Sequence, residues 1–277
     1  MRDNKLLALY GLKHNPFLPG IPVESLWSPP EMDSFLFRIE QLAKEGGFAL
    51  VSGDPGLGKS KTLQLMAHRL GCLDSVVVGV MERPQSSLGD FYREMGQLFG
   101  VNLSPANRYG GFKALRQRWL EHIKSTLFRP VLLIDEAQEM MTCSLNELRL
   151  LGSAKFDSKC LLTIILCGDM RLPERFRSNA LLALGSRIRY RRILESYPAE
   201  TLHEYLEYAL EQAGTPQLMT RSLMDTLVEH SVGNLRLLNT MAAELLTMGA
   251  EKEIAQLDEK LFLDLYTPTP RRAGSRR

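Results

Sequence analysis

One short stretch of the chain has the residue types and the spacing needed to hold a phosphate group. A glycine is followed by four residues and then by Gly-Lys-Ser, which is the P-loop pattern. Its glycines let several backbone N–H groups turn toward one anion, and its lysine can reach the outer phosphates of a nucleotide and take part in catalysis. The alternative is a Gly-rich turn that matches by chance. The residues predicted to bind the nucleotide are Gly53, Asp54, Pro55, Gly56, Leu57, Gly58, Lys59, Ser60 and Lys61.

The sequence on both sides of this loop fits a strand–loop–helix unit. Residues 48–51 form a short apolar run, which is typical of a buried strand. Apolar residues at helical spacing follow the loop: Leu63, Met66, Ala67 and Leu70. The loop is therefore expected at a helix N-terminus, where the helix dipole favours an anion. Ser60 lies next to Lys59, and its hydroxyl can ligate Mg²⁺.

A second apolar run, residues 131–134, ends in two acids, Asp135 and Glu136. The run is too short for a helix and is typical of a strand buried on both faces of a parallel sheet. Open α/β sheets bind ligands at the carboxyl ends of their strands. We expect Asp135 to hold Mg²⁺, directly or through water, and Glu136 to polarise the attacking water. A strand followed by a solvated turn is the alternative, and the preceding P-loop favours the nucleotide site.

The composition of the chain is ordinary. Of its 277 residues, 44% are hydrophobic and 24% charged, and the formal net charge is +2, so any nucleic-acid surface must be local. The four cysteines include no CxxC pair, which argues against a zinc site or a disulfide framework. The sequence has no apolar stretch of membrane-spanning length and no apolar signal region at its N-terminus. These features predict a soluble, cytoplasmic protein with no membrane partner.

Strand patterns alternate with helix patterns, which predicts an α/β fold: a parallel sheet flanked by helices, then a small all-helical lid domain. Further strands are expected at residues 75–80, 161–167 and 190–194, and further helices at 31–44, 88–99 and 112–127. The helical pattern from Ala199 onward breaks at 214–216 and 233–234. Five prolines lead us to expect irregular structure in residues 1–30. The predicted domains are an N-terminal arm (1–30), an ATPase core (31–196), a helical lid (197–266) and a basic disordered tail (267–277).

With these motifs, the chain resembles AAA+ ATPases of the ExeA/GspA-like branch, and most of all transposon-encoded helper ATPases of the TnsC, TniB and IstB type. The resemblance covers nearly the full length. Besides the P-loop, it is carried by Tyr10-Gly11-Leu12, Asn15-Pro16-Phe17, Asp135-Glu136-Ala137-Gln138, Gly168-Asp169, Ser186-Arg187-Ile188 and Gly233-Asn234-Leu235-Arg236. It implies an AAA+ P-loop NTPase that hydrolyses ATP with Mg²⁺ and assembles with copies of itself into a ring or filament.

The resemblance also implies roles for four further residues. Phe17 would pack beside the adenine; the alternative is an arm that covers the sheet edge. Asp169 takes the sensor-1 position near the γ-phosphate, where relatives more often carry Asn, Gln or Thr, and an aspartate would be repelled unless it binds metal or water. Arg187 matches an arginine finger that enters the neighbouring subunit's site. Arg236 matches sensor 2; the alternative is a solvated arginine in the first helical turn after the N-cap Asn234.

Arginine is concentrated in residues 171–192, where Glu174 is the only acid. The arginines are Arg171, Arg175, Arg177, Arg187, Arg189, Arg191 and Arg192. The guanidinium group binds phosphate bidentately and stays charged. Three explanations remain open: ATP contacts at a subunit interface, contacts to a DNA backbone, or an edge strand kept from aggregating by its charge. On a strand, the alternating Arg187, Arg189 and Arg191 would share one face.

A second basic group lies on the helix before the acidic strand and consists of Lys113, Arg116, Arg118 and Lys124. Lys113 and Arg116 are three residues apart and can share a helix face, whereas Arg118 does not follow this spacing. In the helper ATPases that the chain resembles, helices in this region line a channel around duplex DNA. Lys113 and Arg116 are therefore predicted DNA contacts, and a plain solvated helix face is the alternative.

The leading functional prediction is an ATP-dependent, DNA-associated ATPase that assists transposition. It would assemble with ATP on duplex DNA and recruit a transposase or another element-encoded protein to a target. The alternatives are an ExeA/GspA-type secretion ATPase and another regulator that uses its ATP state to gate a protein partner without DNA. The sequence ends after the helical lid, whereas relatives in the cell envelope add a membrane span and a peptidoglycan-binding domain, and this favours the first prediction.

Overall fold

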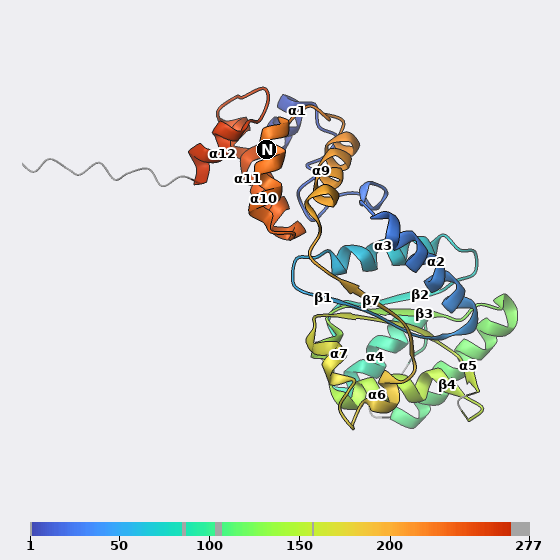
Figure 1. Cartoon of the computed structure of the whole chain (residues 1–277). Helices are drawn as coiled ribbons and strands as arrows, with labels where there is room; N and C mark the ends of the chain where they lie inside the picture. Colours follow the sequence, from blue (N-terminus) through green and yellow to red (C-terminus); the bar gives the residue numbers. More distant parts are fainter. Residues whose placement is uncertain (1, 85–86, 103–106, 157, 267–277) are drawn as a thin grey trace, which may run out of the picture. The chain divides into compact units, whose positions relative to one another are not determined.

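The structure is a computed structural model that describes residues 2–84, 87–102, 107–156 and 158–266. The chain divides into two compact units (Figure 1). One is Ser28–Glu195, and the other consists of the described parts of Met1–Trp27 and Ser196–Arg277.

The unit Ser28–Glu195 is built on a parallel sheet with the strand order β2-β3-β6-β1-β7. The strands are β1 Gly47–Gly53, β2 Val78–Met81, β3 Val131–Ile134, β6 Thr163–Gly168 and β7 Ile188–Leu194. Strand β6 lies between β1 and β3, and its Ile165 is in register with Ala49 on one side and Leu133 on the other. The predicted parallel α/β sheet is therefore confirmed.

Helices cover both faces of this sheet (Figure 1). On one face, α2 Pro30–Glu45 and α3 Lys59–Gly71 pack on Ala49 and Val51, in a core separate from that of the other face. On the other face, Phe48 and Leu50 belong to the core formed with α4 Leu88–Phe99, α5 Arg108–Thr126 and α6 Thr142–Gly152. Successive strand residues point to opposite faces, so a strand covered on both sides must be apolar throughout.

Most of the predicted elements are present. The helix expected at 88–99 is α4, and the one expected at 112–127 is α5, which begins earlier because the side chain of Asn107 accepts a hydrogen bond from the backbone N–H of Gly110. Several short elements were not predicted. They are the 3₁₀ turn η2 Ala137–Glu139, the hairpin β4 Ser153–Ala154 with β5 Lys159–Cys160, and the helices α7 Arg171–Arg175 and α8 Leu182–Gly185.

The second unit is helical, as predicted for its C-terminal part. It contains α1 Arg2–Tyr10, η1 Val23–Ser25, α9 Ala199–Ala213, α10 Arg221–Ser231, α11 Leu235–Glu251 and α12 Glu259–Tyr266. The predicted breaks are confirmed: Gly214, at φ 97°, ends α9, and Gly233 lies between α10 and α11.

The expectation that residues 1–30 are irregular is wrong for α1. The prolines that suggested it begin at Pro16, beyond the helix end at Tyr10. Tyr10 is buried in the core of the helical unit together with residues of α9, α10 and α11. The predicted basic tail, 267–277, lies outside the described residues. Within the described residues, no helix has both the length and the apolar character needed to cross a membrane.

Candidate functional site: a phosphate-binding edge of the sheet

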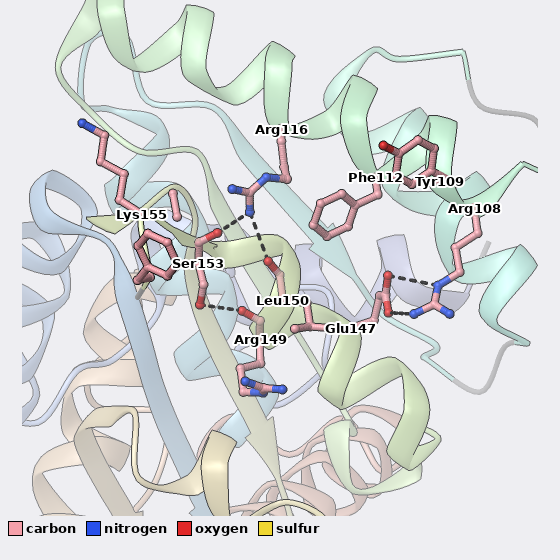
Figure 2. A pocket seen from close by; sticks show the side chains of 11 residues that line it. Arg108, Tyr109, Phe112, Arg116, Glu147, Arg149, Leu150, Ser153 and Lys155 are labelled. Atoms are coloured by element: carbon pink, nitrogen blue, oxygen red, sulfur yellow. Dashed lines mark hydrogen bonds and ion pairs between the residues drawn. The ribbon is translucent and has the colours of Figure 1, made fainter. Parts of the chain in front are cut away.

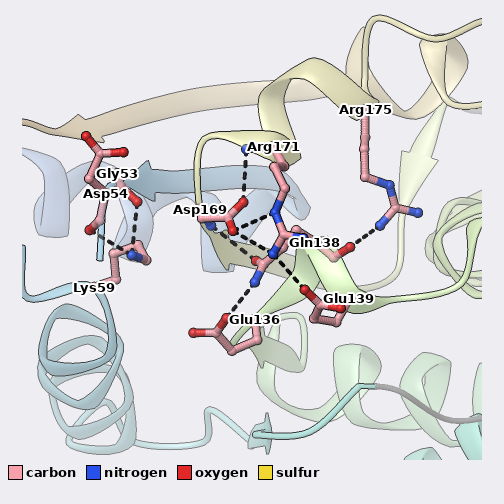
Figure 3. Close-up of polar contacts among 9 residues, drawn as sticks. All are labelled: Gly53, Asp54, Lys59, Glu136, Gln138, Glu139, Asp169, Arg171 and Arg175. Atoms are coloured by element: carbon pink, nitrogen blue, oxygen red, sulfur yellow. Dashed lines mark hydrogen bonds and ion pairs between the residues drawn. The ribbon is translucent and has the colours of Figure 1, made fainter. Parts of the chain in front are cut away.

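Three of the four predicted catalytic residues, Lys59, Glu136 and Asp169, lie at the carboxyl edge of the sheet (Figure 3). The fourth, Arg187, precedes β7 and therefore lies at the opposite, amino edge. Since β1, β6 and β3 are parallel neighbours, all three end at this edge. Strand β1 leads into the P-loop, β6 leads to Asp169, and β3 leads to Asp135 and Glu136. The carboxyl edge of a parallel sheet is where α/β proteins bind their ligands.

The P-loop is a backbone cradle that ends in a helix N-terminus. Gly56 and Gly58 have φ values of 90° and 89°, which L-residues with side chains rarely adopt. Helix α3 starts at Lys59 and has no acid in its first turn, so its positive end is available to an anion. The Lys59 side chain is 9% exposed, and its Nζ donates to the carbonyl oxygens of Gly53 at 2.9 Å and Asp54 at 3.0 Å. The ammonium group is thus held beside the loop.

Two oxygen-bearing side chains at this edge fit the ligand preference of Mg²⁺. Ser60 is exposed in the first turn of α3, and Asp135 is half-buried at the end of β3. Asp135 is fixed by its backbone N–H, which donates to the Met81 carbonyl oxygen at 3.0 Å. Mg²⁺ takes most of its remaining oxygens from water and substrate phosphates, so a hydroxyl and a carboxylate from the protein suffice. The donor set therefore fits a magnesium ion bound together with a nucleotide.

Glu136 projects from a left-handed backbone position at the start of η2. Its φ is 49°, and the residue is exposed. Its carboxylate Oε2 accepts a hydrogen bond of 2.5 Å from Nε2 of Gln138, which is 7% exposed. The Gln138 Oε1 accepts from the backbone N–H of Asp169 at 3.1 Å. One buried amide therefore joins the segment after β3 to the segment after β6.

Asp169 is neutralised locally. Its Oδ1 accepts from the backbone N–H of Arg171 at 2.9 Å, and its Oδ2 accepts from Arg171 Nε at 2.8 Å. Hydrogen bonding to Arg171 holds the pKa of the Asp169 carboxyl below its usual value, although partial burial acts in the opposite direction. Arg171 also donates to Glu139 at 2.7 Å, and its two acidic partners raise the pKa of its guanidinium. This pairing reduces the electrostatic repulsion that an aspartate would meet at the position predicted for sensor 1.

Cys167 lies beneath the same groups, fully buried on β6. Burial raises the pKa of its thiol, the negative charges of Asp135 and Glu136 raise it further, and the positive charge of Lys59 lowers it. The electrostatic influence of all three residues on one thiol agrees with their convergence at this edge.

Arg187 is half-buried at the junction between α8 and β7, and its guanidinium donates to the Ala183 carbonyl oxygen. The expectation that Arg187, Arg189 and Arg191 share one strand face is wrong. Strand β7 begins after Arg187, and Arg189 is an extra residue between the partners of Phe48 and Ala49, which interrupts the alternation.

The other arginines of residues 171–192 with resolved contacts bind groups of the same chain. Arg189 pairs with Glu45, and Arg192 pairs with Glu31 at 2.8 Å. Arg191 donates to the Gly185 carbonyl oxygen at 2.7 Å. Arg175 donates to the carbonyl oxygens of Gln138 and Met140. These contacts anchor β7 and η2 and leave the three explanations for the cluster open.

Phe17 and Arg236 belong to the helical unit. Phe17 is 4% exposed and packs in the core of that unit. Asn234 is the predicted N-cap of α11: its side chain accepts from the backbone N–H groups of Arg236 and Leu237. Arg236 is exposed in the first turn. Contact of Phe17 with adenine and of Arg236 with phosphate remain predictions.

The two predicted DNA contacts have different environments, and Figure 2 shows that of Arg116. Lys113 is exposed, with Nζ 4.6 Å from the centre of the Tyr109 ring. Arg116 lines a groove of about 740 Å³ between α5 and α6. Its Nη1 donates to carbonyl oxygens at the end of α6, those of Leu150 at 3.1 Å, Leu151 at 3.0 Å and Ser153. Arg116 therefore has a structural role as a C-cap, and DNA contact by either residue remains a prediction.

Sequence reasoning gave no role to Gln138 or to Arg171. Gln138 stands two residues after Glu136, inside the Asp135-Glu136-Ala137-Gln138 motif, but its contact with Asp169 depends on the order of strands in the sheet. The pairing of Arg171 with Asp169 could have been predicted, because a cation two residues after an acid at a strand end is a local signal.

Comparison with known proteins agrees with this geometry. A family model described as an AAA domain matches residues 42–176. The general secretion pathway protein A of Aeromonas hydrophila is 28% identical over 235 residues, which cover 83% of this chain and 42% of that protein. The chain thus spans less than half the length of this relative.

Solved structures with the same fold include two archaeal proteins. The ORC2 protein of Aeropyrum pernix in its ADP form has a TM-score of 0.69 at 12% identity, covering 90% of this chain and 70% of that one. The ORC1 protein of A. pernix, solved in complex with DNA, has a TM-score of 0.64 at 14% identity, covering 90% of this chain and 67% of that one.

Fold, motifs and comparisons together define the class of protein. The chain has an AAA+ P-loop NTPase fold, and its residues 42–176 match an AAA domain. The domain match and the Aeromonas relative support an AAA+ ATPase of the ExeA/GspA type.

Proposed function

We propose that this chain is a DNA-associated AAA+ ATPase that assembles with ATP on duplex DNA and helps a transposase select and engage its target. ATP and Mg²⁺ bind at the P-loop, with Ser60 and Asp135 on the metal side and Glu136 activating the attacking water. Hydrolysis then dismantles the assembly. The observation that carries the ATPase part of the proposal is the convergence of Lys59, Asp135 and Glu136 at the carboxyl ends of β1 and β3, the two strands that flank β6.

In this proposal, Arg187 of a neighbouring subunit completes the site. The edge strand β7 begins immediately after Arg187, so Arg187 lies at the amino end of β7, opposite the end at which β1 leads into the P-loop of the same chain. A guanidinium supplied in trans neutralises charge on the transferred phosphoryl group and contributes roughly 10³–10⁵ in rate. Hydrolysis would then depend on assembly, which suits a protein that acts as a switch.

Two observations support DNA as the scaffold for this assembly. Lys113 is exposed on α5, where a lysine can contact a phosphate without losing an internal ion pair. The ORC1 protein with the same fold was solved in complex with DNA. Contacts of this kind are independent of sequence and weaken with salt, because binding releases counterions from the DNA. The transposase as partner rests on the motif resemblance.

A second candidate function is an ATP-dependent regulator of a protein partner without DNA. It is favoured by the 28% identity with a general secretion pathway protein over most of this chain. In that case ATP alone, or ATP with a protein partner, would produce the assembled state.

Electron microscopy of the full chain with ATP and Mg²⁺, with and without duplex DNA, separates the two candidates. Our proposal expects rings or filaments with DNA that disappear in high salt. Lys113→Glu should weaken DNA binding, whereas Lys260→Glu, a charge reversal at an exposed position on α12 outside the basic group of α5, is the control. Assemblies that form equally well without DNA, and that ignore Lys113→Glu, would support the second candidate.

A further inference from the structure

The side chain of Gln138 directly links Glu136 to the segment that contains Asp169. It is buried to 7% exposure, and its two polar atoms bind to opposite sides: Nε2 to Glu136 Oε2 at 2.5 Å and Oε1 to the backbone N–H of Asp169 at 3.1 Å. Figure 3 shows Gln138 between the Asp169 segment and Glu136.

The chemistry of the two partners fixes the orientation of the amide. An ionised carboxylate can only accept a hydrogen bond, and a backbone N–H can only donate one. The NH₂ group must therefore face Glu136 and the oxygen must face the backbone N–H of Asp169. In the flipped amide, two acceptors would face each other at Glu136 and two donors would face each other at Asp169. A side chain at this position needs one donor and one acceptor, about as far apart as those of an amide.

The surrounding structure leaves this amide little freedom. A Cβ on Gly168 would lie 2.3 Å from Gln138 Oε1, so the glycine is required for the close approach of the amide to β6. On the other side, Arg175 donates to the backbone carbonyl oxygens of Gln138 and Met140, which fixes the turn that carries Gln138. A buried polar side chain with both groups satisfied and its backbone anchored is held in one conformation.

We infer that Gln138 is a positioning residue that couples the orientation of the Glu136 carboxylate to the position of the segment Gly168–Asp169. The inference rests on the proposed role of Glu136 as the group that activates water. Glu136 stands on a left-handed backbone position and is exposed, so its carboxylate needs this hydrogen bond to keep one direction. A shift of Asp169, the residue at the sensor position, is transmitted through one amide to Glu136.

The decisive experiment compares ATP turnover of the full chain and its variants, with duplex DNA present and absent. Gln138→Ala should lower kcat by about 10- to 100-fold, the cost of a misplaced catalytic group, with KM for ATP unchanged. Gln138→Glu should lose at least as much, because it places a second carboxylate against Glu136. Gln138→His should recover most of kcat, since a neutral imidazole offers one donor and one acceptor.

Gly168→Ala provides an independent route to the same effect, because its methyl group displaces the amide. It should lower kcat in the wild-type background and add little to Gln138→Ala. The double variant Glu136→Gln, Gln138→Ala should turn over no more slowly than Glu136→Gln alone, since Gln138 acts through Glu136. Multiplicative losses in either pair would overturn the inference.

The possible outcomes distinguish failure of this inference from failure of the proposed role of Glu136 in activating water. Normal turnover in Glu136→Gln would remove the role of Glu136 and the inference with it. A strong loss in Glu136→Gln together with near-normal turnover in Gln138→Ala would overturn the inference alone. Equal losses of stability, ATP affinity and turnover in the Ala and His variants would mean that Gln138 is only structural. Recovery of kcat by His, at unchanged KM, is the result expected if Gln138 positions Glu136.

Discussion

Arg171 holds Asp169 at two points, with its backbone N–H on Oδ1 at 2.9 Å and its side-chain Nε on Oδ2 at 2.8 Å. The acid therefore has its counter-ion two residues along the chain. The same guanidinium reaches Glu139, so one cation pairs with two carboxylates at the edge of the site. This pairing reduces the repulsion between the Asp169 carboxylate and the phosphates of a bound nucleotide. The carboxylate oxygens can still accept a hydrogen bond from water.

The Asp169–Arg171 pair makes stability depend on pH in a defined direction. The pKa of Asp169 is lowered from its ordinary value of 3.8 in the folded state, so the pair stabilises the fold above about pH 4. This contribution is lost as the pH falls through the lowered value. Arg171→Met should therefore reduce the thermal midpoint at neutral pH, and the difference from wild type should shrink progressively as the pH is lowered below 3.8. Arg177→Met, at an exposed position, is the control; a difference independent of pH would contradict the prediction.

Lys59→Ala should abolish nucleotide binding while the fold persists. The buried ammonium lies beside the loop carbonyl oxygens of Gly53 and Asp54, from which it can reach the β- and γ-phosphates. Calorimetric titration with ATP and Mg²⁺ measures the effect. Lys252→Ala, which removes an exposed lysine of the helical unit, should bind ATP as wild type does. Tight ATP binding by Lys59→Ala would refute the assignment of the P-loop.

Glu136→Gln should bind ATP and fail to hydrolyse it. The amide oxygen of the new glutamine can still accept the hydrogen bond from Gln138, so the local geometry is kept and only the base is lost. Loss of a general base lowers turnover by about 10²–10⁴-fold. Phosphate release measures turnover, and size-exclusion chromatography with ATP should show the assembled state persisting. Turnover at the wild-type rate would exclude Glu136 as the water activator.

Gly53→Ala should destabilise the sheet. Gly53 has no left-handed φ; instead, a Cβ there would lie 2.6 Å from the Leu194 carbonyl oxygen at the end of β7. Forcing β7 away should cost about 1–3 kcal/mol in the free energy of unfolding, measured by urea titration. Gly71→Ala, with no atom within 4 Å of the added carbon, is the control and should be neutral or slightly stabilising. An unchanged free energy in Gly53→Ala would contradict the steric argument.

Gly53 also illustrates which features of the fold cannot be predicted from the sequence. The strand–loop–helix unit and the acidic strand could be predicted because periodicity and motif spacing are local. The need for glycine at 53 could not, because it arises from Leu194 on a strand far along the chain. The link from Gln138 to Asp169 likewise depends on the neighbouring positions of β3 and β6, which the strand order alone decides. Contacts that join distant segments are not encoded in any one local pattern.

Arg187→Ala should retain ATP binding and lose hydrolysis if Arg187 completes the neighbouring subunit's site. The Arg187→Ala variant keeps its P-loop, and the Lys59→Ala variant keeps its Arg187. In a mixed assembly, a complete site forms wherever a Lys59→Ala subunit places its Arg187 in the ATP site of an Arg187→Ala subunit. With random neighbours in an equal mixture, about a quarter of the wild-type rate should return, because half of the subunits bind ATP and half of those face an intact arginine. Co-purification of differently tagged variants establishes mixed assembly. No recovery in mixtures shown to co-assemble would exclude a finger acting in trans.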